Sequence, residues 1–394
     1  MEKFAEGVFL RPKLIWRNIF FFGITSGVAL IGGPLYFMKF GISPGIIALT
    51  AFYMVATGMS ITAGYHRLFS HVTYKAHPVI RFLLVFFGSA AFEQSAIEWS
   101  SQHRDHHQYT DTDRDPYDIK KGFFYAHMGW LMFWEHNVDF SNIHDLEKDP
   151  VLRHQNKYYF AWCMTAGLVV PVLIGALMGQ ALAALIFAVC MRVTLVYQST
   201  FFINSLCHTL GSAPYDPDST AKDNWLSALS TNGEGYHNFH HRFPSDYRNA
   251  VKWYQFDPSK WLIKSLEYLG LAWDLKEISK FRILAARLYA DNVRVSRTLE
   301  AIQKQKAEAV RVQEIWKERY ELVRRHLVEW QRQFESYQAL LCERMTESSM
   351  DLQKAARKKM KEARRQYKAV HGQWKELARQ HPNVLQTLLL ATAR

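Results

Sequence analysis

The sequence predicts an all-α integral membrane protein with four transmembrane helices in two hairpins and a helical extension after them. Three observations support this fold class. Four apolar segments have about the ~20 residues that a helix needs to cross a bilayer. Up to residue 280, 24 Lys and Arg nearly balance 23 Asp and Glu, whereas beyond it they number 24 against 13. The last part also has no proline and one glycine between Ala286 and Gln380. We therefore expect a membrane domain, residues 1–280, and a basic helical extension, residues 281–394.

The predicted spans differ in how apolar they are. Arg192 is the one obvious charge within them, and we expect it to face protein or to snorkel rather than meet lipid. Residues 79–99 are a weaker candidate because they contain Glu93 and Glu98, so we expect a helix that lies along the membrane or is buried in the protein. The four predicted spans cover about residues 19–38, 44–63, 158–178 and 181–203.

The topology follows from the lengths of the links between spans. Two hairpins place the short links, residues 39–43 and 179–180, on one side of the membrane and everything else on the other. Lys39 is the only basic residue in those links, so the positive-inside rule makes the other side cytoplasmic. Both termini are then cytoplasmic, and the N-terminal sequence MEKFAEGVFLRPK does not resemble a cleavable signal peptide.

Histidines form the main chemical pattern. Nine of the chain's 17 histidines fall in four short stretches, and each stretch adjoins an apolar segment. Neutral imidazole is the commonest protein ligand for iron, zinc and copper, so the repeated clustering predicts a polynuclear metal centre rather than packing. The nine are His66 and His71 in HRLFSH, His103, His106 and His107 in HRDHH, His208 in NSLCH, and His237, His240 and His241 in HNFHH.

Spacing predicts how these side chains meet. Histidines at i, i+3 and i+4, as in HRDHH and HNFHH, share one face of a helix. His66 and His71 are five residues apart, roughly 140° around an α-helix, so they serve different metals or straddle a helix end. Asn204 and His208 project together from the end of the fourth span. Nine imidazoles suit two ions, and iron working with O2 is favoured over zinc, although other metals are compatible with a purified sample.

Two further patterns indicate structure rather than chemistry. The acidic run TDTDRDPYD, residues 110–118, lacks the spacing of a calcium-binding loop, and we expect a solvated turn. The four cysteines are isolated from one another, without a CxxC pair, which is consistent with a catalytic face in reducing cytosol.

With these motifs in place, the chain resembles the membrane-bound fatty acid desaturases, and within them the stearoyl-CoA (acyl-CoA Δ9) desaturases, in a bacterial form. The likeness extends over most of residues 15–287. The HxxxxH, HxxHH, HxxHH set is specific, because related alkane and sterol monooxygenases have HxxxH and HxxxHH spacings. The matching stretches are ITAGYHRLFSH, EWSSQHRDHH, DPYDIKKGFFYAHMGW, NSLCHTLGSAPYD and GEGYHNFHHRFPSDYR.

The resemblance implies a role for individual residues. The nine histidines match iron ligands in a cytoplasmic cap, and Asn204 matches a residue that holds a metal-bound water. Trp99, Thr200 and Phe201 fall where the family bends its acyl tunnel. Glu93, with Ser101 and Gln102, replaces residues that line the tunnel or contact the CoA head group in animal enzymes. The identity of the head group therefore stays open.

The implied reaction is the introduction of a cis double bond, at the Δ9 position, into a saturated long-chain acyl-CoA, with two iron ions and O2 as co-substrate. No haem-attachment, cytochrome b5, dinucleotide-binding or Cys₄ motif occurs, so we expect a separate ferredoxin, rubredoxin or cytochrome-type donor and a reductase. We expect a bacterial inner membrane. The alternatives are an acyl-lipid (phospholipid) desaturase, a di-iron fatty acyl hydroxylase, and a non-catalytic metal-binding scaffold.

The C-terminal extension predicts one long helix, or a helical hairpin with a break near residues 348–349. Its heptad seam predicts packing against the catalytic membrane domain or a partner, or self-association as a coiled coil. The basic block at residues 354–368 has eight Lys and Arg against one Glu. It is a solvated face or a contact for anionic lipid, an acidic electron carrier or CoA phosphates, and we do not expect nucleic acid. The seam comprises Trp316, Tyr320, Val323, Leu327, Trp330, Phe334, Tyr337 and Leu341.

Overall fold

The computed structural model describes residues 14–133, 140–303, 308–342 and 347–390, and the chain forms two compact units. The first comprises Met1–Ala213 and Asp218–Glu277, and the second comprises Pro214–Pro217 and Ile278–Arg394. Within the described residues the first unit is helical apart from one two-stranded pair, in which β1 (Lys75–Ala76) runs antiparallel to β2 (Ala272–Trp273). This agrees with the all-α prediction.

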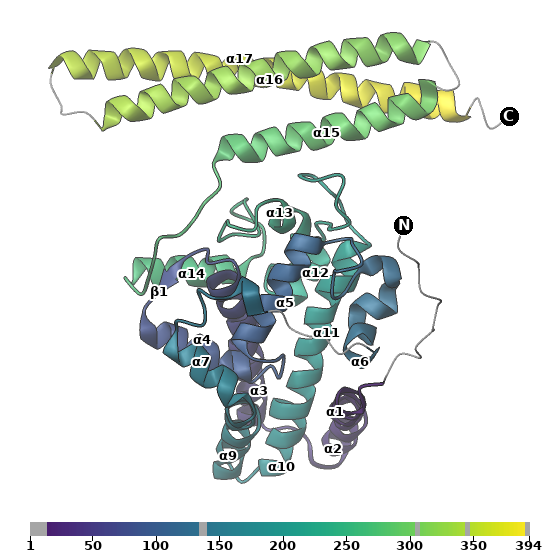
Figure 1. Cartoon of the computed structure of the whole chain (residues 1–394), viewed down its shortest axis with the longest axis vertical. Coiled ribbons are helices and arrows are strands. Elements are labelled where there is room, and N and C mark those ends of the chain that lie inside the picture. The colour runs from purple at the N-terminus through teal and green to yellow at the C-terminus, as the bar shows by residue number, and fades with distance from the viewer. Residues whose placement is uncertain (1–13, 134–139, 304–307, 343–346, 391–394) are drawn as a thin grey trace, which may run out of the picture. The chain divides into compact units, whose positions relative to one another are not determined.

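Four helices in the described residues are long and apolar enough to cross a membrane, which confirms the predicted number of spans. Each contains a π-helical stretch, so each is divided into more than one element (Figure 1). The first span, Trp16–Phe40, contains α1 (Trp16–Gly27) and α2 (Gly33–Phe40), and the second, Pro44–Ser70, contains α3 (Pro44–Met59) and a π stretch, Ser60–Ser70. The third, Tyr159–Leu177, contains α8 (Tyr159–Met164) and α9 (Val170–Leu177). The fourth, Ala181–His208, contains α10 (Ala181–Ala184), α11 (Arg192–Ser205) and a 3₁₀ turn, Leu206–His208.

Tight turns join these helices in two pairs. Gly41 and Gly179 have φ values of 71° and 72°, in the left-handed region that a side chain disfavours. Ser43 caps α3, because its Oγ accepts a hydrogen bond from the backbone of Ile46, and it also donates to Gln180 at 2.7 Å. The turns before α3 and before α10 therefore lie at the same end of the unit, where Figure 1 places α9 and α10.

The predicted weak span, residues 79–99, is two helices instead. α4 (Pro78–Ser89) has 12 residues, roughly 18 Å of helix, which is too short for the ~30 Å of a bilayer core. α5 (Ala96–Tyr109) follows after a loop in which Phe92 and Gln94 have φ values of 60° and 72°. A capping box between Ser95 and Glu98 begins α5, so the chain turns where the sequence changes from apolar to polar.

Arg192 is fully buried, as expected of a charge within a span. Its guanidinium donates to the backbone oxygens of Ala188, Ala90 and Gly167. The contacts hold the loop after α4 against the third and fourth spans. A buried cation is costly without such partners, so these carbonyls explain how a span tolerates it.

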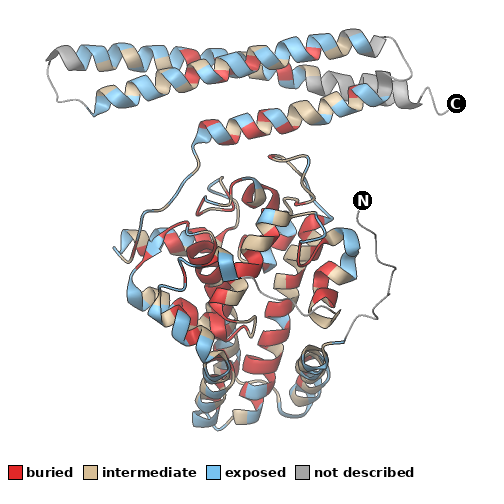
Figure 2. Cartoon of the chain, in the orientation of Figure 1, coloured by how far each residue is buried: buried red, intermediate tan, exposed pale blue. Residues whose placement is uncertain are grey.

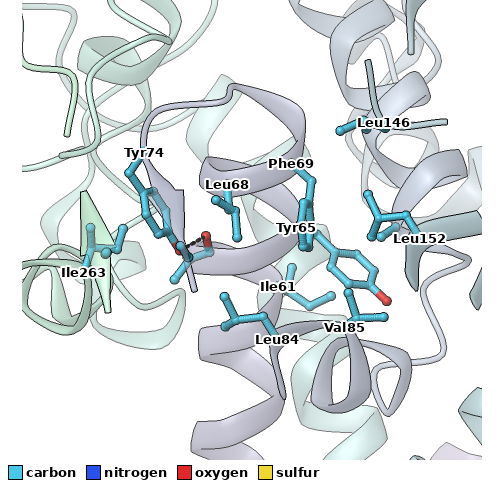
Figure 3. Packing of buried hydrophobic residues seen from close by; sticks show 14 of the residues in the cluster. Ile61, Tyr65, Leu68, Phe69, Tyr74, Leu84, Val85, Leu146, Leu152 and Ile263 are labelled. Atoms are coloured by element: carbon cyan, nitrogen blue, oxygen red, sulfur yellow. Dashed lines mark hydrogen bonds between the residues drawn. The ribbon is translucent and has the colours of Figure 1, made fainter. Parts of the chain in front are cut away.

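The core of the first unit lies where the second span, α4 and α5 meet (Figure 3). Tyr65, Phe69 and Tyr74 are fully buried there, and the Tyr74 hydroxyl donates to the backbone oxygen of Ala63 at 2.9 Å. Figure 2 shows burial concentrated along α11 and α5, while α1 and α2 are largely intermediate or exposed, as expected of helices that face lipid. The remaining helices of the unit are α6 (Trp130–Phe133), α7 (Pro150–Lys157), α12 (Trp225–Ser230), α13 (His237–Arg242) and α14 (Pro258–Tyr268), with short 3₁₀ or π turns at Ile119–Lys121, Tyr125–Gly129 and Phe140–Asn142.

In its described residues the second unit contains three helices, α15 (Lys280–Gln303), α16 (Glu308–Leu341) and α17 (Glu347–Leu390), rather than the one helix or hairpin that the sequence suggested. α16 packs against both α15 and α17. Four residues of the predicted seam are buried within the chain, whereas Leu341 is exposed, and the break predicted near residues 348–349 lies just after the start of α17. The core combines residues of all three helices: Phe281, Leu288, Leu299, Trp316, Val323, Leu327, Trp330, Ala363, Tyr367 and Trp374.

Candidate metal centre

The nine histidines come from four places in the first unit. His66 lies in the π stretch Ser60–Ser70 of the second span, and His71 follows it directly. The backbone N–H of His71 donates to the carbonyl of His66 at 3.1 Å, the i to i+5 bond of a π-helix. The two rings are therefore neighbours, with centroids 4.9 Å apart. α5, the end of the fourth span and α13 supply the other seven.

Five of these rings form one group. One ring nitrogen of each lies within 4.8 Å of the others. The Nε2 of His240 is 2.9 Å from both His66 Nε2 and His107 Nε2, and the Nε2 atoms of His71 and His103 are also 2.9 Å apart. The five-histidine group comprises His66, His71, His103, His107 and His240.

The other four rings form a second group by the same criterion. The Nε2 of His241 lies 3.0 Å from His237 Nε2 and 3.2 Å from His106 Nε2, and His237 Nε2 is 3.0 Å from His208 Nε2. The four-histidine group comprises His106, His208, His237 and His241.

Each of the two HxxHH boxes is divided between the groups. In α5, His103 and His107, four residues apart, point to the five-histidine group, while His106 points to the other. In α13 the i, i+4 pair His237 and His241 belongs to the four-histidine group and His240 to the five. The sequence predicted that all three histidines of a box lie on one face of a helix. In the structure two of them point to one group and the third points to the other. His66 and His71 straddle a helix end as predicted, but both belong to one group.

Contacts behind the rings fix where their lone pairs point. Glu234 Oε2 accepts from His66 Nδ1 at 2.9 Å, and Asp115 Oδ1 accepts from His106 Nδ1 at 2.9 Å. Because Nδ1 then holds the hydrogen, the Nε2 of each ring is a bare lone pair directed into its group. This tautomer is the one that binds a metal through Nε2.

His208 is held in the same way through a hydroxyl. Thr220 donates its hydrogen to Asp111 at 2.6 Å, so its oxygen accepts from His208 Nδ1 at 2.7 Å. Asp111 and Asp115 both lie in the acidic run that we expected to be a solvated turn, and that expectation is wrong: Asp115 is 2% exposed. The acidic run begins only three residues after HRDHH, but the sequence gives no sign of which acid folds behind which ring.

Hydrogen bonding within the protein does not satisfy the rings. His240 Nε2 faces two other Nε2 atoms, yet one ring nitrogen has either one hydrogen or one lone pair. In addition, the Nδ1 atoms of His237 and His240 are buried without a hydrogen-bond partner in the described residues. A cation shared by converging lone pairs resolves the conflict, so both groups fit a metal site.

Electrostatics keeps the rings in the neutral, ligating form. Burial first, and the neighbouring imidazoles second, hold the pKa of these side chains below the ordinary value, so that they are uncharged at neutral pH. The effect applies to His71, His103, His107, His237, His240 and His241.

A second network steadies His66 from behind. Arg67 is 1% exposed and forms ion pairs with Glu234 at 2.9 Å and with Asp257 at 3.0 Å. Glu234 also accepts from the amide of Asn249. These residues were absent from the sequence prediction, although Glu234 lies only three positions before the HNFHH box.

A cavity of about 1130 Å³ adjoins both groups. Four of the nine histidines lie in its wall, two from each group: His66, His103, His106 and His237. The wall is otherwise largely apolar, with residues from α1, α3, α5, α8 and α11. Asn204 and all four residues expected in a tunnel, Trp99, Thr200, Phe201 and Glu93, also line it.

Three of these residues contact one another or the histidines. The Trp99 ring stacks on His103 with centroids 4.8 Å apart. Thr200 donates to Glu93 Oε1 at 2.9 Å, and Trp99 also hydrogen-bonds the Glu93 carboxyl. The wall residues from α5 and α11 thus meet through Glu93.

Comparison with known proteins shows which protein family the chain matches. The model of the family described as Fatty acid desaturase matches residues 44–274. The chain is 42% identical over 291 residues to Acyl-CoA desaturase 1 of Saccharomyces cerevisiae, covering 72% of this chain and 56% of that one. It is 42% identical over 226 residues to the Probable acyl-CoA desaturase of Schizosaccharomyces pombe, covering 57% and 47%. With Stearoyl-CoA desaturase 5 of Bos taurus it shares 36% over 284 residues, covering 70% and 84%.

The match therefore spans about half the length of the two fungal relatives and most of the bovine one. The region matched by the family model includes all nine histidines and three of the four membrane-length helices, and the first helix, Trp16–Phe40, lies before it. This chain is an integral membrane protein of the fatty acid desaturase family.

Proposed function

We propose that the protein is an acyl-CoA desaturase that uses O2 to introduce a cis double bond, at the Δ9 position, into saturated long-chain acyl-CoA. The names of its relatives support an acyl-CoA substrate. The observation that carries the proposal is that nine ring nitrogens converge in two groups beside one cavity. Its volume, about 1130 Å³, exceeds the ~300–1,000 Å³ of ordinary small-molecule pockets, as a long chain requires.

We assign the two histidine groups as the ligands of two iron ions, one to each group. Two groups favour two ions, and sets of four and five imidazoles suit iron better than tetrahedral zinc. Asn204 lines the cavity on the turn before His208, a position from which it would hold a water at the four-histidine group. The ligands would be His66, His71, His103, His107 and His240 for one ion, and His106, His208, His237 and His241 for the other.

The cavity wall would position the acyl chain. Trp99, stacked on His103, brings the wall directly against the five-histidine group. Thr200 and Phe201 supply the facing wall from α11. Hydrogen bonds and ring contacts fix these walls. The depth to which the acyl chain enters the cavity would therefore decide which of its carbon atoms lie beside the histidines.

The chemistry needs a strong oxidant, since no acid, base or nucleophile among the side chains breaks an unactivated methylene C–H bond. Iron held by these imidazoles would supply that oxidizing power from O2. In net terms, the chain loses two hydrogens, O2 is reduced to two waters, and two electrons with two protons come from outside the acyl chain. Glu234, Asp115 and Thr220 keep the rings in the ligating tautomer throughout.

The electrons would come from a separate ferredoxin, rubredoxin or cytochrome-type donor and its reductase, because the sequence has no motif for such a carrier. We place the histidine groups and both termini on the cytoplasmic side of a bacterial inner membrane. The single lysine in the two short turns, Lys39, supports that orientation.

The test is to express the wild-type protein, His241→Ala and His144→Ala in a host without aerobic desaturation, with a competent electron donor. Double bonds in the total fatty acids are located by mass spectrometry. We expect O2-dependent cis-Δ9 chains with wild type and with His144→Ala, whose ring is 73% exposed, and none with His241→Ala.

Other products would redirect the assignment. Hydroxy fatty acids would establish the di-iron hydroxylase instead. Isotope-labelled acyl chains followed through the acyl-CoA and phospholipid pools decide between acyl-CoA and acyl-lipid desaturation, according to which pool first contains the double bond. Absence of any product from iron-loaded wild type would contradict the proposal and favour a non-catalytic scaffold.

A further inference from the structure

The acyl cavity contains a carboxyl group with no evident role in holding metal. Glu93 lies in the loop between α4 and α5, and its neighbours fix that loop. The Phe92 carbonyl accepts from the Tyr197 hydroxyl at 2.9 Å, and the Gln94 N–H donates to the Tyr159 hydroxyl at 3.0 Å. The side chain of Glu93 therefore stays in the wall and does not swing to solvent.

The two oxygens of Glu93 have different surroundings. Oε1 accepts from Thr200 at 2.9 Å, and the carboxyl also hydrogen-bonds Trp99. Oε2 is buried and has no hydrogen-bond partner in the described part of the chain. An unpaired oxygen in an apolar wall is costly when it is charged and much less so when it is protonated.

No cation in the described residues forms an ion pair with this carboxyl. The ionizable groups that interact with it electrostatically include the hydroxyls of Tyr65 on the second span and Tyr197 on α11. Arg192 directs its guanidinium to three backbone carbonyls and not to Glu93. The other titratable or charged side chains of the cavity wall are Arg17, Glu98, Tyr117, Tyr159, Cys163, Glu234 and the histidines His66, His103, His106 and His237.

We propose that binding of the acyl chain is coupled to uptake of one proton by Glu93, which makes this residue a determinant of substrate affinity. The inference rests on the proposed function, since it requires that an acyl chain fill the cavity. The Glu93 residue as a whole is only partly buried and lines the cavity. A bound chain replaces the water beside this side chain with hydrocarbon, which an ionized carboxylate would then face. The protonated carboxyl presents a neutral surface to the chain instead.

The pKa of the Glu93 carboxyl supports this coupling. Burial raises the pKa of Glu93 to about 7, while hydrogen bonds from Thr200 and Trp99 favour the ionized form. In the free protein both forms are therefore present near neutral pH. Filling the cavity replaces the water along this part of the wall with hydrocarbon, and this raises the pKa of the carboxyl further.

Because binding takes up a proton, affinity for the acyl chain depends on pH. Below pH 7 most of the free protein has a protonated Glu93, and affinity for the chain is constant. Above pH 7 the bound complex holds one more proton than the free protein, so affinity falls by up to about tenfold per pH unit until the pKa of the complex is reached.

The experiment is calorimetric titration of the purified full-length protein in detergent with stearoyl-CoA at pH 8.0, in two buffers that differ in ionization enthalpy. The difference in heat gives the protons taken up per chain bound. We expect close to one for wild type and none for Glu93→Gln, whose affinity should not change between pH 6.5 and 8.0. Glu98→Gln makes the same change at another carboxyl of the wall and should retain the uptake.

A second variant covers the case in which Glu93→Gln does not fold. Thr200→Val removes a hydrogen bond that favours the ionized carboxyl, so the free protein should already be more protonated at pH 8.0 and the uptake should decrease. Binding without proton uptake, or uptake that persists in Glu93→Gln, overturns the inference and leaves the proposed function intact. Failure of wild type to bind stearoyl-CoA at any pH overturns the proposed function as well.

Discussion

The histidine-lined part of the first unit and the three-helix second unit are both helical, yet they place ionizable groups in opposite ways. The first buries six of the nine imidazoles and half-buries the other three, and it also buries Arg67, Glu234 and Asp257. The second buries aromatic rings such as Trp316 and Trp374, and leaves all eight cations of residues 354–368 exposed. Burying an ionizable group costs free energy unless a partner compensates. The first region therefore needs ion pairs or a bound cation to compensate its ionizable groups, whereas the core of the second is formed by apolar and aromatic contacts within the chain.

The largest effect should come from removing a ring of the second core. Trp316 is 1% exposed, stacks near Trp374 with centroids 4.6 Å apart, and donates to Asn292 at 2.8 Å. We expect Trp316→Ala to lower the free energy of unfolding of the second unit by about 3–5 kcal/mol, measured by chemical denaturation. Val328→Ala, on the exposed side of α16, should change it by no more than about 0.5 kcal/mol. Equal effects of the two would show that the aromatic core is not what holds these helices.

The next effect concerns the carboxylates behind the rings. Glu234→Gln and Asp115→Asn each replace the charged carboxylate that orients one histidine with a neutral amide, which is a weaker acceptor and can also donate. We expect each to reduce iron affinity about 10–100-fold at one of the two groups. Iron retained during dialysis against a graded chelator measures this. Asp274→Asn, at a half-exposed ion pair with Lys75, is the matched control and should behave as wild type. Wild-type retention in both test variants would contradict the orienting role.

A smaller effect should follow from weakening the start of α5, the helix that carries three of the histidines. Ser95 accepts from the backbone of Glu98 and also contacts Asn156. Ser95→Ala should lower the free energy of unfolding of the first unit by about 1 kcal/mol. Ser95→Asp retains a capping oxygen and should recover part of the loss. A loss of the same size in both variants would indicate that the contact with Asn156 matters and the cap does not.

The smallest effect is expected on the basic face of α17. Lys361 has Arg357, Lys358, Arg364 and Arg365 at the helix neighbour positions and no ion pair in the described residues. Like charges at these spacings destabilize a helix, so Lys361→Gln should stabilize the second unit by about 0.5 kcal/mol at low salt, and the gain should vanish at 1 M salt. Thermal unfolding at both salt concentrations tests this, and destabilization at low salt would contradict it.

Sequence patterns predicted what depends on composition and short spacing. Hydropathy predicted four membrane-length helices, and the histidine boxes predicted that nine rings would meet. The division of HRDHH between two groups was beyond sequence reasoning, because it depends on how α5 is rotated against α13. The proximity of His66 and His71 depends on a π-helical stretch, which the residues of HRLFSH do not predict. Asp115 was misjudged because the sequence does not show that the chain turns back after HRDHH and places this carboxylate against His106.

The same limit applies to the C-terminal extension. The heptad seam predicted helices with a buried stripe, and Trp316, Val323, Leu327 and Trp330 are buried. It did not predict that α15 would supply Phe281, Leu288 and Leu299 to the same core, because that packing joins segments of the chain that short spacing does not relate.

The central claim is that the two histidine groups hold two iron ions, and metal content per chain tests it most directly. Purified protein, reconstituted with ferrous iron and freed of excess, is analysed by mass spectrometry for all transition metals. The account predicts two iron ions for wild type and for His144→Ala, and about one for His106→Ala, which removes a ligand of the four-histidine group alone. An iron content near zero in wild type, or an unchanged content in His106→Ala, would contradict it.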